Sequence, residues 1–285
     1  MPLELPQGPL VSVDWLDAHR SEVRLVDVRG EVRPPGEKPR YFPKRGAYDD
    51  GHLPGAVFVD WTRDIVDLND PVPVQIARAE HFASTMSSIG VGESTVVVAY
   101  DDYRSVFAAR FAWALRYYGH DAVRVLDGGW QAWLRAGKPT TREVPKPETA
   151  RFASRPRPEL RRTANEVAAA LEGGKALLID ARAKDQYDGV VSAAARKGHI
   201  PGAKSVLYAS LFDDEWRMKD AAALAATFAE AGVDPKDPRP IVAYCNGGVT
   251  ACAVRNALAV LGRDDVAIYD GSWNEWGNDS ARPIE

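Results

Sequence analysis

Cys245, one of only two cysteines in the chain, lies where an apolar run stops and a glycine pair begins. The run at 240–244 reads PIVAY, and the residues that follow read CNGGVTAC. Residues 249–262 then show the pattern of a helix that ends at a glycine. A strand, a glycine loop and a helix start in this order gather backbone N–H groups and the positive end of a helix dipole around one point. A cysteine at that point is expected to act as a thiolate nucleophile beside a bound anion.

The loop after Cys245 is the candidate anion-binding cradle. Its members are Asn246, Gly247, Gly248, Val249 and Thr250. Glycine allows backbone conformations and close approaches that a Cβ atom would block. Thr250 lies at or near the helix N-cap, where it can cap the helix or donate its hydroxyl towards the sulfur. The alternative is that Cys245 is a small buried core residue, as an isolated cysteine commonly is.

The residues beyond this loop narrow the chemistry. A phosphatase built on a cysteine loop needs an arginine six positions after the cysteine, which holds phosphate through two hydrogen bonds. That position is Ala251, and the next arginine, Arg255, lies a turn further along the helix. Phosphatase activity is therefore disfavoured. Cys252 falls among small apolar residues and is expected to pack inside the helix, with a disulfide to Cys245 as the alternative.

The composition excludes several other classes of protein. The 285 residues are 45% hydrophobic, which suffices for two ordinary domains with a core each. The net charge of −4 comes without a basic block, so nucleic acid is not expected as a partner. The start MPLELPQGPL lacks the regions of a signal peptide, and no apolar segment has membrane-spanning length. We expect a soluble cytoplasmic protein, without a zinc site because the cysteines lack companions at ligand spacing.

Four motifs occur twice in the chain, in the same order. RLVDVRG at 24–30 returns as LLIDAR at 177–182, and GHLPGAVFVDW at 51–61 returns as GHIPGAKSVLY at 198–208. VVVAYDDY at 96–103 matches PIVAYCNG at 240–247, and VRVLDGGWQAW at 123–133 matches VAIYDGSWNEW at 266–276. The spacing between the copies shortens along the chain, which indicates duplication with changes of loop length rather than a solenoid. In this register Asp101 occupies the position of Cys245.

Each copy alternates short β-rich runs with helical patterns. In the first copy the runs are 25–28, 57–59, 96–100 and 123–126, and a helical pattern ends at Gly119. This alternation predicts an α/β fold of two tandem domains, each a parallel sheet with helices on both faces. The expected domains are 1–138 and 160–285, joined by a proline-rich linker at 139–159. Thr163 and Glu166 form a predicted capping box at the first helix of the second domain.

The paired GHLPGA and GHIPGA motifs, the CNGGVTAC loop and YDGSWNEWG at 269–277 together resemble the tandem-domain rhodanese sulfurtransferases over nearly the whole chain. The resemblance implies a catalytic second domain in which Cys245 takes sulfane sulfur from thiosulfate or 3-mercaptopyruvate as a persulfide. The sulfur then passes to cyanide or a thiol, and a thioredoxin-like reductant is a further candidate partner. Neither a metal nor an organic cofactor is implied. The first domain would be catalytically silent, because Asp101 cannot carry a persulfide.

The choice of donor depends on the second and third loop positions. In thiosulfate-preferring members that resemble this chain those positions are cationic, whereas Asn246 and Gly247 are uncharged and favour 3-mercaptopyruvate. Backbone N–H groups alone could still hold thiosulfate. Mercaptopyruvate-type members also bind the substrate carboxylate with arginines, and here Arg196 and Arg182 are the candidates. The position of the first expected arginine is taken by Asp185, Gln186 or Asp188.

Other candidate substrate contacts come from the repeated motifs. His52 matches a histidine that the resemblance assigns to a proton relay with an aspartate, here Asp49 or Asp50, although its twin His199 suggests that both brace a turn. Trp273 is expected to wall a cleft near the loop, with core packing as the alternative. The rival to catalysis is a rhodanese-like binding or redox-sensing module, in which Cys245 would oxidise to a sulfenic acid.

Overall fold

The computed structural model describes residues 3–34 and 37–285 and divides into two compact units. Unit 1 contains the chain up to Asp67, Ile76–Arg157 and Asp214–Met218. Unit 2 contains Leu68–Gln75, Pro158–Asp213 and Lys219–Glu285. Each unit is thus completed by a short segment from the other half of the sequence, which neither the repeats nor the composition indicated.

Unit 1 is built on a five-stranded sheet in the order β1-β7-β6-β2-β5, with every pairing parallel. The strands are β1 (Leu10–Val11), β2 (Arg24–Asp27), β5 (Val57–Phe58), β6 (Val97–Tyr100) and β7 (Val123–Leu126). The helices are α1 (Val13–His19), α2 (Arg45–Asp50), α3 (Ala79–Ser88), α4 (Val106–Tyr117) and α5 (Gly129–Arg135), with a short 3-10 turn η1 (Arg20–Glu22). A separate antiparallel pair joins β3 (Gly30–Val32) and β4 (Tyr41–Pro43).

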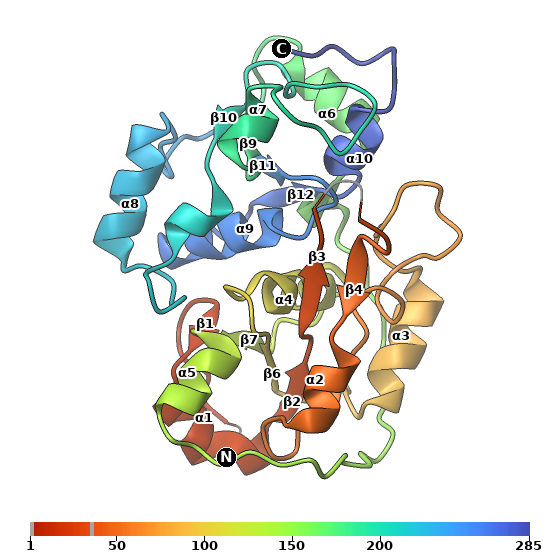
Figure 1. Ribbon diagram of the computed structural model, residues 1–285, viewed down its shortest axis with the longest axis vertical. Coiled ribbons are helices and arrows are strands. Elements are labelled where there is room, and N and C mark those ends of the chain that lie inside the picture. Colours follow the sequence, from red (N-terminus) through yellow and green to blue (C-terminus); the bar gives the residue numbers. More distant parts are fainter. Residues whose placement is uncertain (1–2, 35–36) are drawn as a thin grey trace. The chain divides into compact units, whose positions relative to one another are not determined.

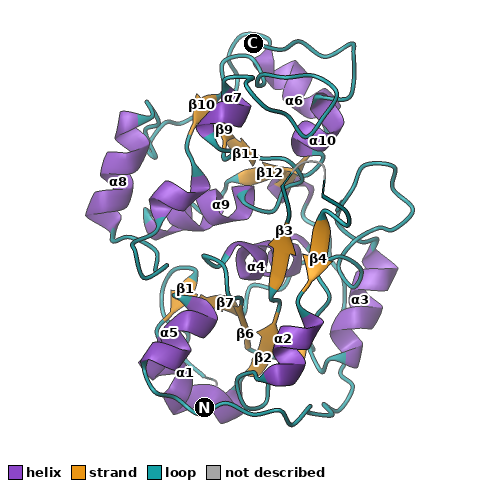
Figure 2. Ribbon diagram, in the orientation of Figure 1, coloured by secondary structure: helices purple, strands orange, loops and turns teal. Residues whose placement is uncertain are grey.

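Unit 2 repeats this plan. Its parallel sheet has the order β10-β9-β11-β12-β8, which is the order of unit 1 read from the opposite edge. The strands are β8 (Arg161–Arg162), β9 (Leu177–Asp180), β10 (Lys204–Ser205), β11 (Ile241–Tyr244) and β12 (Ala267–Tyr269). The helices are α6 (Ala164–Leu171), α7 (Lys184–Tyr187), α8 (Ala221–Glu230), α9 (Ala251–Val260) and α10 (Ser272–Trp276), with 3-10 turns η2 (Pro158–Leu160) and η3 (Tyr208–Leu211). The predicted duplication and parallel sheets are confirmed, and helices flank the strands of each unit (Figures 1 and 2).

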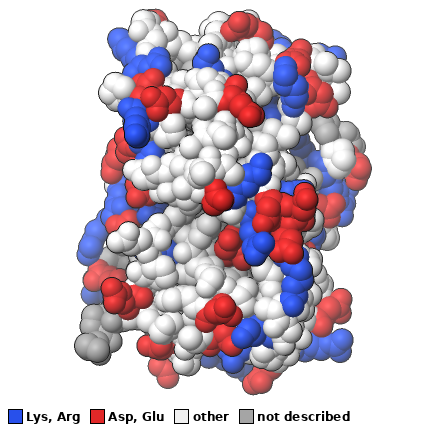
Figure 3. Space-filling view, turned by 90° about the vertical axis from the view of Figure 1, so that its left-hand side faces the viewer, with Lys and Arg blue, Asp and Glu red and all other residues white. Residues whose placement is uncertain are grey.

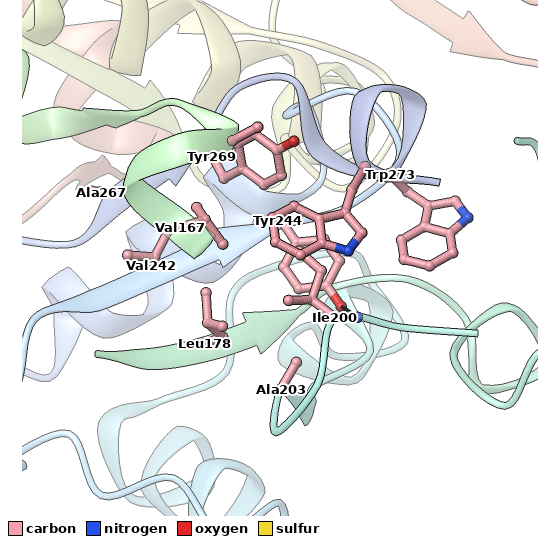
Figure 4. Packing of buried hydrophobic residues seen from close by; sticks show 11 residues of the cluster. Val167, Leu178, Ile200, Ala203, Val242, Tyr244, Ala267, Tyr269 and Trp273 are labelled. Carbon is pink, nitrogen blue, oxygen red and sulfur yellow. Dashed lines mark hydrogen bonds between the residues drawn. The ribbon is translucent and has the colours of Figure 1, made fainter. Parts of the chain in front are cut away.

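The core of unit 2 lies between one face of its sheet and two helices. Alternate residues of the central strands, among them Val242 and Tyr244, point to this face and meet Val167 of α6 and Trp273 of α10 (Figure 4). Side chains alternate along a strand, so Ala243 points to the opposite face of the sheet. All four residues of β11 are buried, as expected for the centre of a parallel sheet. The strand that leads to Cys245 is therefore buried on both faces.

The proline-rich segment expected to link the domains has no helix or strand between 142 and 157 and runs extended along unit 1. The Ala150 N–H donates to Ser87 O, the Arg155 N–H donates to Tyr118 O, and Phe152 is buried against Phe82. These contacts agree with the predicted surface strap. The capping box of Thr163 and Glu166 is confirmed, with both reciprocal hydrogen bonds present.

The surface carries both signs of charge. Acidic and basic side chains are interspersed over the face shown in Figure 3. Among the described residues, no helix combines the length and the apolar character needed to cross a membrane.

A buried ion pair braces the start of each unit's second repeated motif. In unit 2, Arg182 donates from Nε and Nη2 to the Asp180 carboxylate and from Nη2 to Gly198 O (2.8 Å), and both side chains are fully buried. In unit 1, Arg29 makes the same contacts to Asp27 and to Gly51 O (2.7 Å). A buried charge must be paired. The pair therefore fixes the GH[LI]PGA turn against the strand end in both copies.

Replacement of Arg182 by Met is expected to lower the free energy of unfolding of unit 2 by about 3–5 kcal/mol, because it leaves the Asp180 carboxylate buried without its partner. The matched control is Arg239→Met. Arg239 binds Asp237 two residues away with the same Nε and Nη2 geometry, but on the surface, where solvent screens the pair. Hydrogen exchange of β11 peptides, read by mass spectrometry, measures both effects. Equal protection losses in the two variants would contradict the role of burial.

Candidate active site

Cys245 follows directly after β11 and is 3% exposed. Its carbonyl oxygen accepts from the Trp273 N–H (3.0 Å), and its own N–H donates to Ser272 Oγ (3.2 Å). The next carbonyl, that of Asn246, accepts from the Asn274 N–H (2.8 Å). The first turn of α10 thus holds the backbone on both sides of the cysteine, and the rest of the loop leads from there into α9.

The loop leaves several backbone donors available. Within residues 3–34 and 37–285, no hydrogen-bond acceptor is found for the N–H groups of Gly247, Val249, Thr250 and Ala251. Gly248 has φ +72°, the left-handed conformation that the glycine pair predicted. Thr250 is the N-cap residue of α9, as expected, but its backbone is already helical (φ −68°, ψ −22°) and its side chain makes no cap hydrogen bond, so the capping alternative is wrong. The helix therefore begins with unpaired donors, as an anion site requires.

The matching loop of unit 1 is occupied by the chain itself. Asp101 is 1% exposed, and its Oδ1 accepts from the N–H groups of Tyr103 (2.7 Å) and Ser105 (3.0 Å). Its Oδ2 accepts from Phe107 and Ala108 (both 2.9 Å). Burial raises the pKa of Asp101 to about 7, while these backbone hydrogen bonds act in the opposite direction. Four converging donors match an ionised carboxylate, because in the neutral acid one oxygen carries a proton.

The two loops correspond residue by residue. In the register that aligns Asp101 with Cys245, the donors Tyr103, Ser105 and Phe107 match Gly247, Val249 and Ala251, and these are three of the four N–H groups left unpaired in unit 2. One pair differs, since Ala108 donates to Asp101 whereas its match, Cys252, donates its N–H to Val249 O. The same loop thus holds a carboxylate in one copy and offers its donors beside a thiol in the other.

The second loop position forms an uncharged pair. Asn246 Nδ2 donates to Oε1 of Gln186 on α7 (2.8 Å), and Asn246 Oδ1 is buried without a hydrogen-bond partner among the described residues. Of the three residues that could stand in for the expected arginine, Gln186 is therefore the one at the loop. Asp185 is exposed and accepts from the Gln186 N–H, and Asp188 pairs with Lys184 on the surface.

The two candidate arginines are engaged elsewhere. Arg196 donates to the carbonyl oxygens of Trp276 and Arg282 (both 2.8 Å) and to that of Asp279, so it ties the C-terminal segment to unit 2. Arg182 is the buried brace of Asp180, and its guanidinium lies over the Trp273 ring at 4.3 Å. Both side chains thus make bracing contacts, while Arg182 Nη1 and Arg196 Nε are buried without a hydrogen-bond partner among the described residues.

The histidines of the repeated motif also brace turns. His52 is fully buried in unit 1, stacks on Tyr48 at 3.8 Å, and has its ring nitrogens 2.8 Å from Tyr48 O and 3.0 Å from Glu143 O. Its twin His199 stacks in the same way on Tyr187 at 3.6 Å. Asp49 and Asp50 are exposed, and Asp49 pairs with Arg45. These contacts favour the bracing role that the occurrence in both copies suggested.

Trp273 and Cys252 lie in the interior. Trp273 is fully buried in the core and donates from Nε1 to Ser192 Oγ (3.0 Å), which favours packing over the wall of a cleft (Figure 4). Cys252 is fully buried in α9, its Sγ contacts Gly248 O at 3.1 Å, and both cysteines are free thiols. The disulfide alternative is therefore wrong for this structure, and Cys252 packs as expected.

Ser272 was missed by sequence reasoning, although it contacts the candidate nucleophile directly. Its hydroxyl accepts the Cys245 N–H and donates to Tyr269 O (2.7 Å). The signal lay in the repeat, because GSW in the second copy aligns with GGW in the first, so that Ser272 matches Gly129. A comparison of the two copies would therefore have identified Ser272 as a second difference, beside that between Asp101 and Cys245.

Replacement of Asp101 by Asn is expected to destabilise unit 1 by about 1–3 kcal/mol, since an amide NH₂ replaces an acceptor oxygen and leaves buried N–H groups at the start of α4 unsatisfied. Hydrogen exchange of the α4 peptide measures the loss. The control is Asp102→Asn, because Asp102 contacts Lys44 in a partly exposed pair. Unchanged protection of α4 in Asp101→Asn would contradict the role of the carboxylate.

Comparison with known proteins agrees with this architecture. The rhodanese-like domain model matches residues 12–136 and 163–279. The chain is 34% identical to the sulfur carrier protein TtuD of Thermus thermophilus over 96% of its own length and 95% of that protein, and 34% identical to rat thiosulfate sulfurtransferase over 81% and 79%. It superposes on the 3-mercaptopyruvate enzyme SseA of Escherichia coli with a TM-score of 0.83 at 33% identity, covering 94% of this chain and 99% of that one. The chain belongs to the rhodanese-like family and contains two such domains in tandem.

Proposed function

We propose that this chain is a sulfurtransferase in which Cys245 is the nucleophile and carries the transferred sulfur as a persulfide. The observation that carries the proposal is the loop after β11, whose unpaired N–H groups match those that hold the Asp101 carboxylate in unit 1. Relatives named as a thiosulfate sulfurtransferase and a 3-mercaptopyruvate enzyme support the same reaction class. A loop that stabilises an anion at the sulfur suits every state of such a cycle, because thiolate, persulfide and donor are all anionic.

The cycle balances without an outside oxidant. The Cys245 thiolate attacks the outer sulfur of thiosulfate or the thiol sulfur of 3-mercaptopyruvate, and an S–S bond to the cysteine forms. The S–S bond of thiosulfate, or the C–S bond of 3-mercaptopyruvate, breaks in the same step. Thiosulfate leaves as sulfite, and 3-mercaptopyruvate leaves as pyruvate after its carbanion takes a proton. An acceptor thiolate or cyanide then attacks the outer sulfur of the persulfide, and the Cys245 thiolate returns. A thioredoxin-like dithiol can serve as the acceptor by the same step.

The uncharged Asn246–Gln186 pair favours 3-mercaptopyruvate as the preferred donor. Thiosulfate is a dianion, and no side chain paired at this loop position adds a positive charge to offset it. 3-Mercaptopyruvate carries a single carboxylate, and uncharged backbone N–H groups hold one negative charge more easily than the two of thiosulfate. Thiosulfate remains the second donor, since the same N–H groups can hold it more weakly.

We assign no substrate contact to His52, Asp50, Arg182, Arg196 or Trp273. Polar atoms of the histidine, the two arginines and the tryptophan are bonded within their own units, and Asp50 contributes its backbone carbonyl to Arg142. The site that binds the sulfur donor is therefore the loop of Asn246 to Thr250. The rival function, a binding or redox-sensing module, would use the same loop without turnover.

Cys245→Ser is expected to abolish sulfur loading. Mass spectrometry of the intact chain after treatment with 3-mercaptopyruvate should show a gain of one sulfur atom that a reductant removes, because only a thiolate at this loop can form the persulfide. Cys252→Ala is the matched control and should load like the wild type. Loading that survives Cys245→Ser would refute the assignment, and a wild type that never loads from either donor would favour the binding module.

Asn246→Arg is expected to raise kcat/KM for thiosulfate relative to 3-mercaptopyruvate by about tenfold, because a cation near the sulfur stabilises a dianion more than a monoanion. The control is Asn246→Met, which has a similar length and no charge and should leave the donor ratio near its wild-type value. Steady-state kinetics with cyanide as the acceptor give both ratios. An equal change in both variants would show that charge at this position does not select the donor.

A further inference from the structure

We propose that Ser272 is a positioning residue for Cys245, an inference that rests on the proposed function of Cys245 as the nucleophile. Ser272 is fully buried at the start of α10. Its hydroxyl donates to the Tyr269 carbonyl (2.7 Å) and accepts the N–H of Cys245 (3.2 Å). The hydroxyl therefore links the end of β12 to the residue that follows β11.

The backbone of Ser272 is in a conformation that a side chain disfavours. Its φ is +52°, in the left-handed region where a Cβ atom crowds the neighbouring carbonyl. Non-glycine residues persist in this region when the surroundings compensate, and they concentrate at functional sites. The next two residues, Trp273 and Asn274, donate their N–H groups to the carbonyl oxygens of Cys245 and Asn246. The strained residue therefore begins the segment that holds the backbone of the cysteine.

Unit 1 provides an internal comparison. Gly129 occupies the matching position with nearly the same φ, +51°, and the next N–H, that of Trp130, donates to Asp101 O (2.8 Å). A Cβ atom added to Gly129 would lie 2.2 Å from Asp101 O. The copy without a nucleophile thus has the residue that the backbone favours, whereas the copy with Cys245 has a serine at a conformational cost.

The serine adds a second fixed point to the nucleophile. The carbonyl of Cys245 is held by the Trp273 N–H, as the carbonyl of Asp101 is held by Trp130. Only in unit 2 is the N–H of this residue also bonded to a side-chain hydroxyl from the same segment. A residue held at both its N–H and its carbonyl has a fixed Cα–Cβ direction, so the sulfur is presented to the donor in one orientation. Asp101 needs no such fixing, because its own carboxylate is held by four N–H groups.

The test compares Ser272→Gly with Ser272→Ala in the full chain. Glycine removes both the hydroxyl and the backbone strain, whereas alanine removes the hydroxyl and keeps the strain. We expect the rate of persulfide formation at saturating 3-mercaptopyruvate to fall about tenfold or more in both variants, because small misplacement of a reacting group costs rate strongly. The donor concentration that gives half the maximal rate should stay unchanged. The Ser272→Gly variant should melt at or above the wild-type temperature, and Ser272→Ala below it.

The same variants are also treated with iodoacetamide, and the alkylation rate of Cys245 is read by peptide mass spectrometry. This readout needs no sulfur donor, so a wild type that forms no persulfide would refute the proposed function while a slower alkylation in Ser272→Gly would still support the positioning role. Ser210→Gly is the control, because its hydroxyl bonds a backbone carbonyl, Leu207 O, in unit 2. A stable Ser272→Gly variant with wild-type alkylation and persulfide rates would overturn the proposal, as would rates that follow only the melting temperatures.

Discussion

The constraint on which this structure depends is the need of backbone N–H groups at a helix start for an acceptor. A buried strand that turns at once into a helix leaves such donors at the strand end, away from solvent that could satisfy them. Unit 1 satisfies them with the carboxylate of Asp101, and unit 2 has a thiol at the same point. The sheet and the two helices packed on it, α6 and α10, keep this point fixed. The two loops differ in their chemistry because one surrounds a carboxylate and the other a thiol.

The fold was predictable because its signals are local and repeated. The predicted strand 123–126 is β7, the helical pattern that ends at Gly119 contains α4, and the capping box lies at Thr163. Gly248 has the backbone conformation that its type suggested. Each of these depends on side-chain alternation, apolar periodicity or a short hydrogen-bonded motif, which adjacent residues define.

The unpredicted features depend on contacts between residues far apart in the sequence. Arg196 bonds carbonyls at 276, 279 and 282, so its role is set by the course of the C-terminal segment. The exchange of 68–75 and 214–218 between the units likewise has no local signal. The Ser272 bond to Cys245 joins the ends of two strands that only the sheet brings together. Sequence alone gives the residue types at such places but not their partners.

The repeat separates bracing from chemistry. Features common to both copies serve the fold: the Asp–Arg pairs, the stacked His–Tyr pairs and the Trp N–H that holds the strand-end carbonyl. Three of the positions that differ between the copies lie around one point: Asp101 against Cys245, Asp102 against Asn246, and Gly129 against Ser272. A residue that makes the same contacts in both units is explained by those contacts, without a role in a reaction. By this criterion His52 and Arg182 belong with the bracing residues.

The difference between Asp101 and Cys245 also explains why unit 1 keeps a well-formed loop. If alanine stood at 101, the four N–H groups that now meet the carboxylate would lose their acceptor in a buried place, at a cost of about 1–3 kcal/mol for each unsatisfied group. An aspartate replaces the thiol and supplies two acceptor oxygens in the same position. The four N–H groups in unit 1 are therefore bonded to the chain's own side chain and are not available to a bound anion. The loop of unit 2 has a smaller thiol at this point, and among the described residues its matching N–H groups at 247, 249 and 251 have no acceptor.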